Sequence, residues 1–292
     1  MKHIISLIRP HHWIKNLFVF LPMFFGGALT DTDAILGSLA AFFAYSFAAS
    51  SIYCYNDILD VEDDRRHSVK CRRPIASGAI SILKGYIIMA VMILLSALSV
   101  LLLGDRAALL AVVMSVYFVL NIAYCLLLKH FAVVDVVVLS FGFVLRILAG
   151  SAATGIIASH WLVLMTFLLA LFLSFAKRRD DVVRMMKTGE APRHNTKRYN
   201  MTFINQAITV TAAVTLVCYV MYTISPEVAA RTNFRYGYLT TILVILGLLR
   251  YMQLTSVDQK SGDPIKLLYS DRFLQIVVML WMLSYILMIY VV

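Results

Sequence analysis

The chain has 292 residues, of which 61% are hydrophobic and 14% are charged, and its formal net charge is +10. Ordinary soluble domains carry about 25% charged residues, so this composition excludes a soluble globular protein and indicates one that exposes apolar surface to lipid. The basic residues are split over several short segments between apolar runs, which disfavours nucleic-acid binding. We therefore expect a membrane protein with no nucleic-acid partner.

Apolar runs of roughly 17–24 residues follow one another along the chain, and a helix of this length crosses about 30 Å of hydrocarbon. They predict an all-α, polytopic membrane protein that forms a single catalytic domain over residues 1–292. Nine transmembrane helices are expected at about residues 16–30, 35–55, 83–103, 107–128, 132–154, 160–176, 204–224, 236–252 and 273–291. Residues 1–15 are basic and interrupted by Pro10, so we expect an amphipathic segment on the membrane surface and no cleaved signal peptide.

Lysine and arginine gather on one side of these predicted spans. The N-terminus and the loops near residues 56–84, 129, 177–203 and 250–272 hold 22 of the 26 lysines and arginines, whereas the opposite loops hold three. Basic loops stay on the cytoplasmic side, so the N-terminus is expected in the cytoplasm and the C-terminus outside. The protein is then expected in the cell (inner or plasma) membrane, with residues 56–84 and 177–203 as cytoplasmic active-site loops.

The sequence YNDILDVEDDRRH at residues 55–67 places five carboxylates within eight positions at the end of the second predicted span. On a helix that advances 100° per residue, four side chains share an arc of about 100°, and Glu62 points away from them. These four are Asn56, Asp57, Asp60 and Asp64. Like charges on one face destabilise a helix, so the pattern predicts a bound cation; a solvated helix end with salt bridges is the alternative.

Magnesium suits such a group, because it prefers oxygen ligands and typically takes one or two carboxylates and completes its shell with substrate phosphates. The basic residues that follow have the complementary charge for those phosphates. They are Arg65, Arg66, Lys70, Arg72 and Arg73. The stretch therefore predicts a site for Mg²⁺ and a phosphorylated substrate.

The spacing Asn-Asp-x-x-Asp-x-x-x-Asp at residues 56–64 resembles the NDxxDxxxD motif of the UbiA superfamily of intramembrane prenyltransferases, where it also follows the second span. Other stretches are similar to one branch, the decaprenyl-phosphate phosphoribosyltransferases, which use 5-phosphoribosyl-1-diphosphate and a polyprenyl phosphate. These stretches are RPHHWIKN (9–16), NDILDVEDDRRHSVKCRRPIASG (56–78), NIAYCLLLKHFAVVDV (121–136), GFVLRILAG (142–150) and KRRDD (177–181). They cover most of the first two hundred residues.

Typical aromatic prenyltransferases of this superfamily carry a second acidic motif, DxxxD, after the sixth span. Here Asp180 and Asp181 are adjacent, so they diverge by 100° on a helix, and no carboxylate stands four residues after either. This departure favours a polyprenyl monophosphate acceptor over a prenyl diphosphate donor. The basic residues at 177–179 would then bind the lipid phosphate, and the alternative for each of them is that it only anchors the sixth span at the membrane surface. The resemblance assigns four residues to the lipid phosphate: Lys15, Asn16, Lys177 and Arg178. The role of Asp181 is left open.

Arg146 falls inside the fifth predicted span, and if that span enters the membrane near Asp135, eleven residues place Arg146 roughly 16 Å deep at 1.5 Å per residue. A charge within the membrane is a functional candidate by default. It is expected to contact the donor's phosphates or to form an ion pair with a carboxylate such as Asp135, whose own role is left open. Tyr124 and Lys129 lie near the cytoplasmic end of the fourth span and are assigned to the donor's phosphates, with anchoring as the alternative.

The resemblance, together with these features, implies Mg²⁺-dependent transfer of 5-phosphoribose from phosphoribosyl diphosphate to a decaprenyl-like polyprenyl phosphate, which makes a lipid-linked sugar donor for cell-envelope synthesis. The predicted donor ligands are Lys70, Arg72, Arg73, Tyr124, Lys129 and Arg146, beside the four metal ligands at residues 56–64. One alternative is an aromatic or quinone-precursor prenyltransferase that uses a prenyl diphosphate. Another is a transporter of ions or organic anions, which the clustering of acidic residues on one side disfavours. A homo-oligomer is left open.

Overall fold

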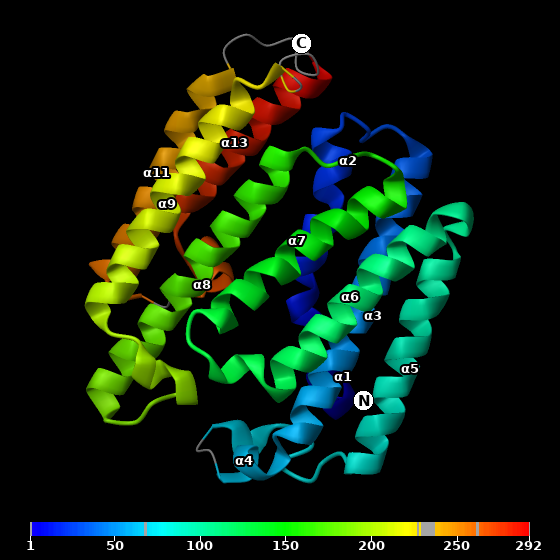
Figure 1. Cartoon of the computed structure of the whole chain (residues 1–292), viewed down its shortest axis with the longest axis vertical. Coiled ribbons are helices and arrows are strands. Elements are labelled where there is room, and N and C mark those ends of the chain that lie inside the picture. The colour runs from blue at the N-terminus through cyan, green and yellow to red at the C-terminus, as the bar shows by residue number, and fades with distance from the viewer. Residues whose placement is uncertain (1, 67–68, 227, 229–236, 261–262, 292) are drawn as a thin grey trace. The chain divides into compact units, whose positions relative to one another are not determined.

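The structure is a computed structural model of the chain, and it describes residues 2–66, 69–226, 228, 237–260 and 263–291. Over these ranges the regular elements are all helices (Figure 1). Eight of them are long and apolar enough to cross a membrane. The prediction of an all-α membrane protein is thus confirmed.

The eight long helices each overlap one of the predicted spans from 35–55 onward. They are α3 (Thr32–Leu59), α5 (Ile82–Leu101), α6 (Ala107–Leu126), α7 (Val134–Thr154), α8 (His160–Thr188), α9 (Met201–Thr223), α11 (Thr241–Ser256) and α13 (Arg272–Tyr290). Helix α8 continues well beyond the predicted boundary at residue 176 and ends at Gly189, which adopts the left-handed conformation that favours glycine (φ 74°). The first part of the expected loop 177–203 is therefore helical.

The first predicted span, residues 16–30, has a different geometry. A short helix α1 (Lys2–Ile8) is followed by a 3₁₀ helix, η1 (Pro10–Phe20), and a five-residue α-helix, α2 (Leu21–Phe25). Helix η1 approaches α7 so closely that a Cβ atom on Gly150 would lie 1.9 Å from the Val19 carbonyl oxygen. Only glycine fits at this contact.

Contacts within the chain group into two compact units. Unit 1 consists of Met1–Leu126 and Leu145–Ala158, and unit 2 consists of Leu127–Val144 and Ser159–Val292. The first half of α7 thus belongs to unit 2 and its second half to unit 1. The single catalytic domain over residues 1–292 stays a prediction.

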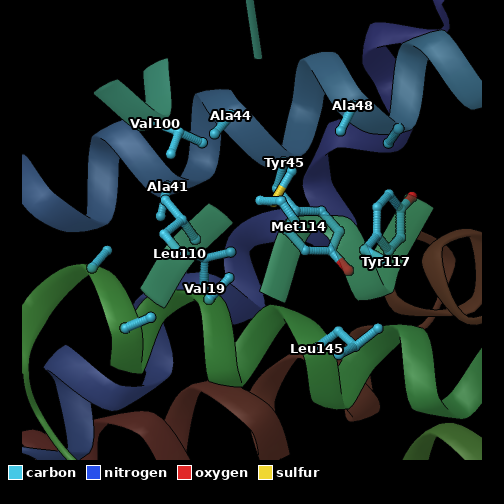
Figure 2. Packing of buried hydrophobic residues seen from close by; sticks show 14 of the residues in the cluster. Val19, Ala41, Ala44, Tyr45, Ala48, Val100, Leu110, Met114, Tyr117 and Leu145 are labelled. Atoms are coloured by element: carbon cyan, nitrogen blue, oxygen red, sulfur yellow. The ribbon is translucent and has the colours of Figure 1, made fainter. Parts of the chain in front are cut away.

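The core of unit 1 is built around α3, whose buried face carries small residues. Ala41, Ala44 and Ala48 are fully buried, and small side chains of this kind let membrane helices approach closely. Figure 2 shows Tyr45 and Tyr117 beside them, and their ring centroids are 4.3 Å apart. This aromatic pair lies at the base of one candidate site described below.

Helices α8 and α9 form the main packing contact of unit 2. Arg179 of α8 lies buried against the C-terminus of α11, where its Nη1 donates to the Thr255 carbonyl at 2.6 Å and its Nη2 to the Ser256 carbonyl at 3.3 Å. A cation at a helix C-terminus satisfies carbonyl groups that lack helical partners and complements the helix dipole. Arg179 therefore holds α11 against α8.

Candidate functional site

The predicted acidic face lies at the junction of α3 with a short helix, α4 (Val61–Arg66). Helix α3 ends at Leu59, and the backbone hydrogen bonds from Asp60 N to Asn56 O (2.9 Å) and from Asp64 N to Asp60 O (2.8 Å) continue across the junction. The chain therefore keeps nearly helical geometry, which brings side chains three to seven residues apart onto one side.

Asp57 and Asp64 lie together at this junction and are both almost fully buried, at 1% and 2% exposed. The Nη1 atom of Arg73 donates to Asp57 Oδ1 at 3.1 Å and to Asp64 Oδ2 at 2.7 Å. Asp60 accepts a hydrogen bond from the Asn56 amide at 3.0 Å. The structure thus links the four predicted metal ligands into two neighbouring pairs.

Glu62 lies apart from this group. Its carboxylate is exposed and pairs with Arg65, three residues later, at 2.8 Å. Pairs of this kind on a helix surface contribute only a few tenths of a kcal/mol, about 0.2–0.5. Glu62 therefore points toward solvent, as the 100° periodicity predicted.

Arg73 is positioned by the loop that follows α4. The 3₁₀ turn η2 (Lys70–Arg72) leads into Arg73, and the next residues fold under the end of α3. Ile75 and Ile80 are buried there against Ile58. Burial of these apolar side chains holds the loop in place, whereas Arg72 stays exposed.

Arg9 completes the group, and sequence analysis did not assign it to the site. Its Nη2 donates to Asp57 Oδ1 at 2.6 Å, and its guanidinium lies 5.0 Å from the centre of the Tyr53 ring. The backbone of Arg9 is left-handed, with φ 50° and ψ 58°, which is unusual for a residue other than glycine. The available signal was that Arg9 opens the stretch RPHHWIKN, but a contact between residues 48 positions apart is not readable from local pattern.

The two oxygens of Asp57 differ in their hydrogen bonding. Asp57 Oδ2 is buried and accepts no hydrogen bond from the described residues, although Oδ1 of the same carboxylate accepts two. Within the same ranges no group of three or more His, Cys, Asp or Glu side chains converges to hold a metal. Magnesium needs no such cage, because one or two carboxylates and substrate phosphates suffice. The pair Asp57 and Asp64, with its free buried oxygen, fits a Mg²⁺ ion.

Arg146 belongs to a second polar cluster of unit 1. Its Nε donates to Asn16 Oδ1 at 2.8 Å, and its guanidinium lies 4.7 Å from the centre of the Tyr45 ring. The Asn16 amide in turn donates to Ser46 Oγ at 2.9 Å. Cation–π contact and these hydrogen bonds offset part of the cost of burying the charge. The structure thus joins Arg146 and Asn16, which sequence analysis had assigned to different substrates.

Asp135 anchors a third polar cluster, within unit 2. Arg178, which is 1% exposed, donates from Nε to Asp135 Oδ2 at 2.7 Å, and the Tyr199 hydroxyl donates to Asp135 Oδ1 at 3.0 Å. The Val133 backbone N–H donates to the Tyr199 oxygen at 2.6 Å. Burial raises the pKa of the Tyr199 hydroxyl, so it stays protonated and donates. Both oxygens of Asp135 are thus satisfied.

The same cluster extends to Asp181 of α8. Its Oδ2 accepts from Arg178 Nη1 at 2.9 Å and from Arg193 Nε at 3.1 Å. Sequence analysis had assigned Arg178 to a lipid phosphate and had left Asp135 and Asp181 open. It had not considered Tyr199 or Arg193, which lack a local pattern.

The remaining candidate residues are half-buried and lie on several helices. They are Lys15 in η1, Lys70 in η2, Tyr124 in α6, Lys129 in the 3₁₀ turn η4 (Leu128–His130) and Lys177 in α8. The backbone carbonyl of Lys129 accepts a hydrogen bond from the Asn195 amide at 3.0 Å. Their assignment to phosphates stays a prediction.

The sequence profile of the UbiA prenyltransferase family matches residues 17–289. The chain belongs to the UbiA prenyltransferase family. A UbiA homologue from Archaeoglobus fulgidus bound to GPP and Mg²⁺ matches the fold with a TM-score of 0.70 at 18% identity, over 99% of this chain and 100% of that chain. At this identity the likeness concerns the fold alone.

Curated relatives are more similar in sequence. The decaprenyl-phosphate phosphoribosyltransferase of Mycobacterium tuberculosis is 32% identical over 95% of this chain and 91% of its own length. The enzyme of that name from Corynebacterium glutamicum is 30% identical, over 98% of this chain and 86% of its own. Membership of the family and these relatives make this UbiA protein a multi-pass membrane transferase.

Proposed function

We propose that this UbiA protein transfers 5-phosphoribose from phosphoribosyl diphosphate to a polyprenyl phosphate and releases diphosphate. The observation that carries the proposal is the buried pair Asp57 and Asp64, with a free carboxylate oxygen and arginines beside it. It suits a metal-bound diphosphate, and Asp180 and Asp181 in α8 do not form the second DxxxD motif that serves a prenyl diphosphate. The names of the relatives support the same donor and acceptor.

The donor's diphosphate is the leaving group in this reaction. The bond between the anomeric carbon and the diphosphate oxygen breaks, and a bond from that carbon to an acceptor phosphate oxygen forms. Mg²⁺ supplies neutralisation of the charge that develops on the diphosphate. Asp57 and Asp64 would hold the ion, with Asp60 and its partner Asn56 beside them.

Basic side chains would bind the phosphates that the metal does not cover. Lys70, Arg72 and Arg73 follow the acidic helix end and are assigned to the donor, together with Tyr124, Lys129 and Arg146. Charge-assisted hydrogen bonds of this kind are roughly twice as strong as neutral ones. The acceptor oxygen is already anionic, so the reaction requires no strong general base.

The resemblance to the decaprenyl-phosphate phosphoribosyltransferases assigns the acceptor's phosphate to Lys15, Asn16, Lys177 and Arg178. Arg178 forms ion pairs with Asp135 and Asp181, and these carboxylates would fix its orientation. A guanidinium held in this way is pre-organised for binding, which lowers the entropy lost when phosphate arrives.

The proposal includes a membrane topology with nine crossings, in which η1 and α2 form the first. The N-terminus is then cytoplasmic, the C-terminus lies outside the cell membrane, and the acidic end of α3 faces the cytoplasm, where phosphoribosyl diphosphate is soluble. The distribution of lysine and arginine supports this orientation.

A transfer assay tests the proposal. Purified protein is incubated with phosphoribosyl diphosphate labelled in the ribose, Mg²⁺ and decaprenyl phosphate, and the label is counted in the organic phase. We expect label there only when all three are present, and its loss when a chelator removes Mg²⁺. Consumption of geranyl diphosphate with an aromatic acceptor, without ribose transfer, would instead establish an aromatic prenyltransferase.

A further inference from the structure

We propose that Arg9 takes the place of the divalent cation at Asp57 in the ligand-free protein and passes to the donor's diphosphate when the metal and donor bind. This inference rests on the proposed function and adds a donor-binding residue to it. Arg9 would thereby make metal binding depend on the donor.

The contacts of Arg9 support an exchange of partners. Its Nη2 lies 2.6 Å from Asp57 Oδ1, and the side chain makes no other hydrogen bond or ion pair with the described residues. A guanidinium has five N–H donors, so most of them remain available. The Arg9 side chain is 19% exposed whereas Asp57 is 1% exposed, so Arg9 is the more accessible partner of this ion pair.

The backbone around Arg9 is held in place on both sides. The Ser50 hydroxyl of α3 donates to the Ile8 carbonyl at 2.8 Å, and the Trp13 indole donates to Ser50 Oγ at 3.0 Å. Between these two anchors Arg9 adopts its left-handed conformation, and Pro10 follows it. Strained residues of this kind persist where the surroundings over-determine them, and they cluster at ligand sites. The strain aims the guanidinium at Asp57.

Electrostatics then link the metal and the donor. A divalent ion that binds Asp57 alone would stand beside the positive charges of Arg9 and Arg73, which lowers its affinity. A diphosphate brings negative charge that pairs with both arginines and with the ion. Each ligand therefore raises the affinity of the other, and the coupling is reciprocal.

The two affinities are expected to shift in opposite directions when Arg9 is neutralised. In Arg9→Gln, Mn²⁺ alone should bind more tightly, because a competing cation is gone. Phosphoribosyl diphosphate in the presence of Mn²⁺ should bind roughly tenfold more weakly or worse, because a charge-assisted hydrogen bond is lost. A purely structural arginine would weaken both.

Electron paramagnetic resonance tests these two shifts. It measures how tightly Mn²⁺ binds to the purified full-length protein with and without phosphoribosyl diphosphate. Arg250→Gln is the matched control, because Arg250 forms an equally short ion pair (2.6 Å) with the mostly buried Asp271. Both affinities should stay at the wild-type values in that control. Arg9→Lys retains the charge, so it should keep the wild-type Mn²⁺ affinity and weaken only donor binding.

The outcomes separate the inference from the proposed function. If Arg9→Gln raises the affinity for Mn²⁺ alone and lowers the affinity for the donor, the exchange of partners is supported. If Arg9→Gln does not fold, Arg9→Lys decides: weaker donor binding at an unchanged Mn²⁺ affinity supports the exchange. Unchanged affinities, or equal weakening of both, would overturn the role of Arg9 while the metal site stands. A wild-type protein that binds no Mn²⁺ with or without the donor would overturn the proposed function as well.

Discussion

Asp57 at the end of α3 and Asp135 at the start of α7 are both buried carboxylates beside arginines, yet their hydrogen bonding differs. Among the described residues, one oxygen of Asp57 accepts hydrogen bonds from two guanidinium groups and the other accepts none, whereas Asp135 has a partner on each oxygen. A buried unsatisfied polar atom costs about 1–3 kcal/mol, so stability does not explain the arrangement at Asp57. The difference distinguishes a carboxylate with an oxygen available to a metal ion from one whose two oxygens are both held by protein partners.

Both carboxylates also lie near a strained backbone position. Arg9 (φ 50°) contacts Asp57 directly, and Val133 (φ 68°) precedes Asp135 by two residues. At Asp57 the strained residue contributes its side chain, whereas at Asp135 the strained residue contributes its backbone N–H, which Tyr199 accepts. The first strained residue pairs with its carboxylate through a guanidinium, and the second holds Tyr199 through its backbone N–H.

Asp57→Asn should show the largest difference between the two regions, because it should lower activity without lowering stability. It removes a negative ligand from the proposed Mg²⁺ site, so transfer should fall by at least about a hundredfold, as for loss of a key electrostatic group. The melting temperature should change little, because Asp57 is incompletely satisfied in the native protein. Asp60→Asn should also abolish turnover, and Glu62→Gln is the control that should stay close to wild type. Equal damage by Glu62→Gln would contradict the facial assignment.

Asp135→Asn should act chiefly on stability. It leaves the buried Arg178 without its charge partner, a loss that typically costs about 3–5 kcal/mol. The melting temperature in detergent should therefore fall far more than for Asp57→Asn, and Tyr199→Phe should cost less. Replacing Arg178 by Met in the Asp135→Asn background should restore part of the loss. A thermally neutral Asp135→Asn would show that this network is not a scaffold.

Lys177→Ala and Arg178→Ala probe the proposed acceptor contacts. Loss of a charge-assisted hydrogen bond to phosphate costs about 1.5–3 kcal/mol, so KM for polyprenyl phosphate should rise about ten- to a hundredfold. KM for phosphoribosyl diphosphate should change little. Arg178→Ala should also lower the melting temperature, because Asp135 loses its partner. A KM change on the donor alone would move both residues to the donor site.

Asp271→Asn should have the smallest effect on the melting temperature, and this effect should depend on pH. The Arg250 guanidinium beside Asp271 lowers the pKa of that carboxyl. A depressed native pKa contributes stability above the unfolded pKa, about 3.9, and the contribution disappears as pH falls through the native value. Asp271→Asn keeps the helix cap on Leu274, so it isolates the ion pair. Its melting temperature should lie slightly below wild type at neutral pH and converge with it in acid.

Most of the helices could be predicted from the lengths of the apolar runs alone, because the thickness of the hydrocarbon layer sets how long a membrane-spanning helix must be. Charged residues indicate where the membrane ends, but they do not predict where a helix ends. The prediction stopped the sixth span at residue 176, but α8 continues to Thr188, because Lys and Arg favour helices and Arg178 pairs with Asp181 one turn later. The 3₁₀ geometry of η1 was also not foreseen.

The acidic part of the site was predictable because its periodicity is local. Asp57 and Asp64 meet on one side, as a 100° step per residue requires. Arg9 and Tyr199 were not predictable, because each reaches its carboxylate through a contact more than forty residues away in sequence. Neither long-range packing nor a left-handed backbone at a residue other than glycine leaves a periodic signal.

The most direct test of the central claim is the melting temperature of wild type and Asp57→Asn with phosphoribosyl diphosphate, measured with and without Mg²⁺. A ligand at a hundred times its Kd stabilises the native state by about 2.7 kcal/mol. We predict that the donor raises the wild-type melting temperature only when Mg²⁺ is present, more than geranyl diphosphate does, and that Asp57→Asn shows no shift. A shift that needs no Mg²⁺, that survives Asp57→Asn, or that is larger with geranyl diphosphate would contradict the assignment of this helix end as the donor site.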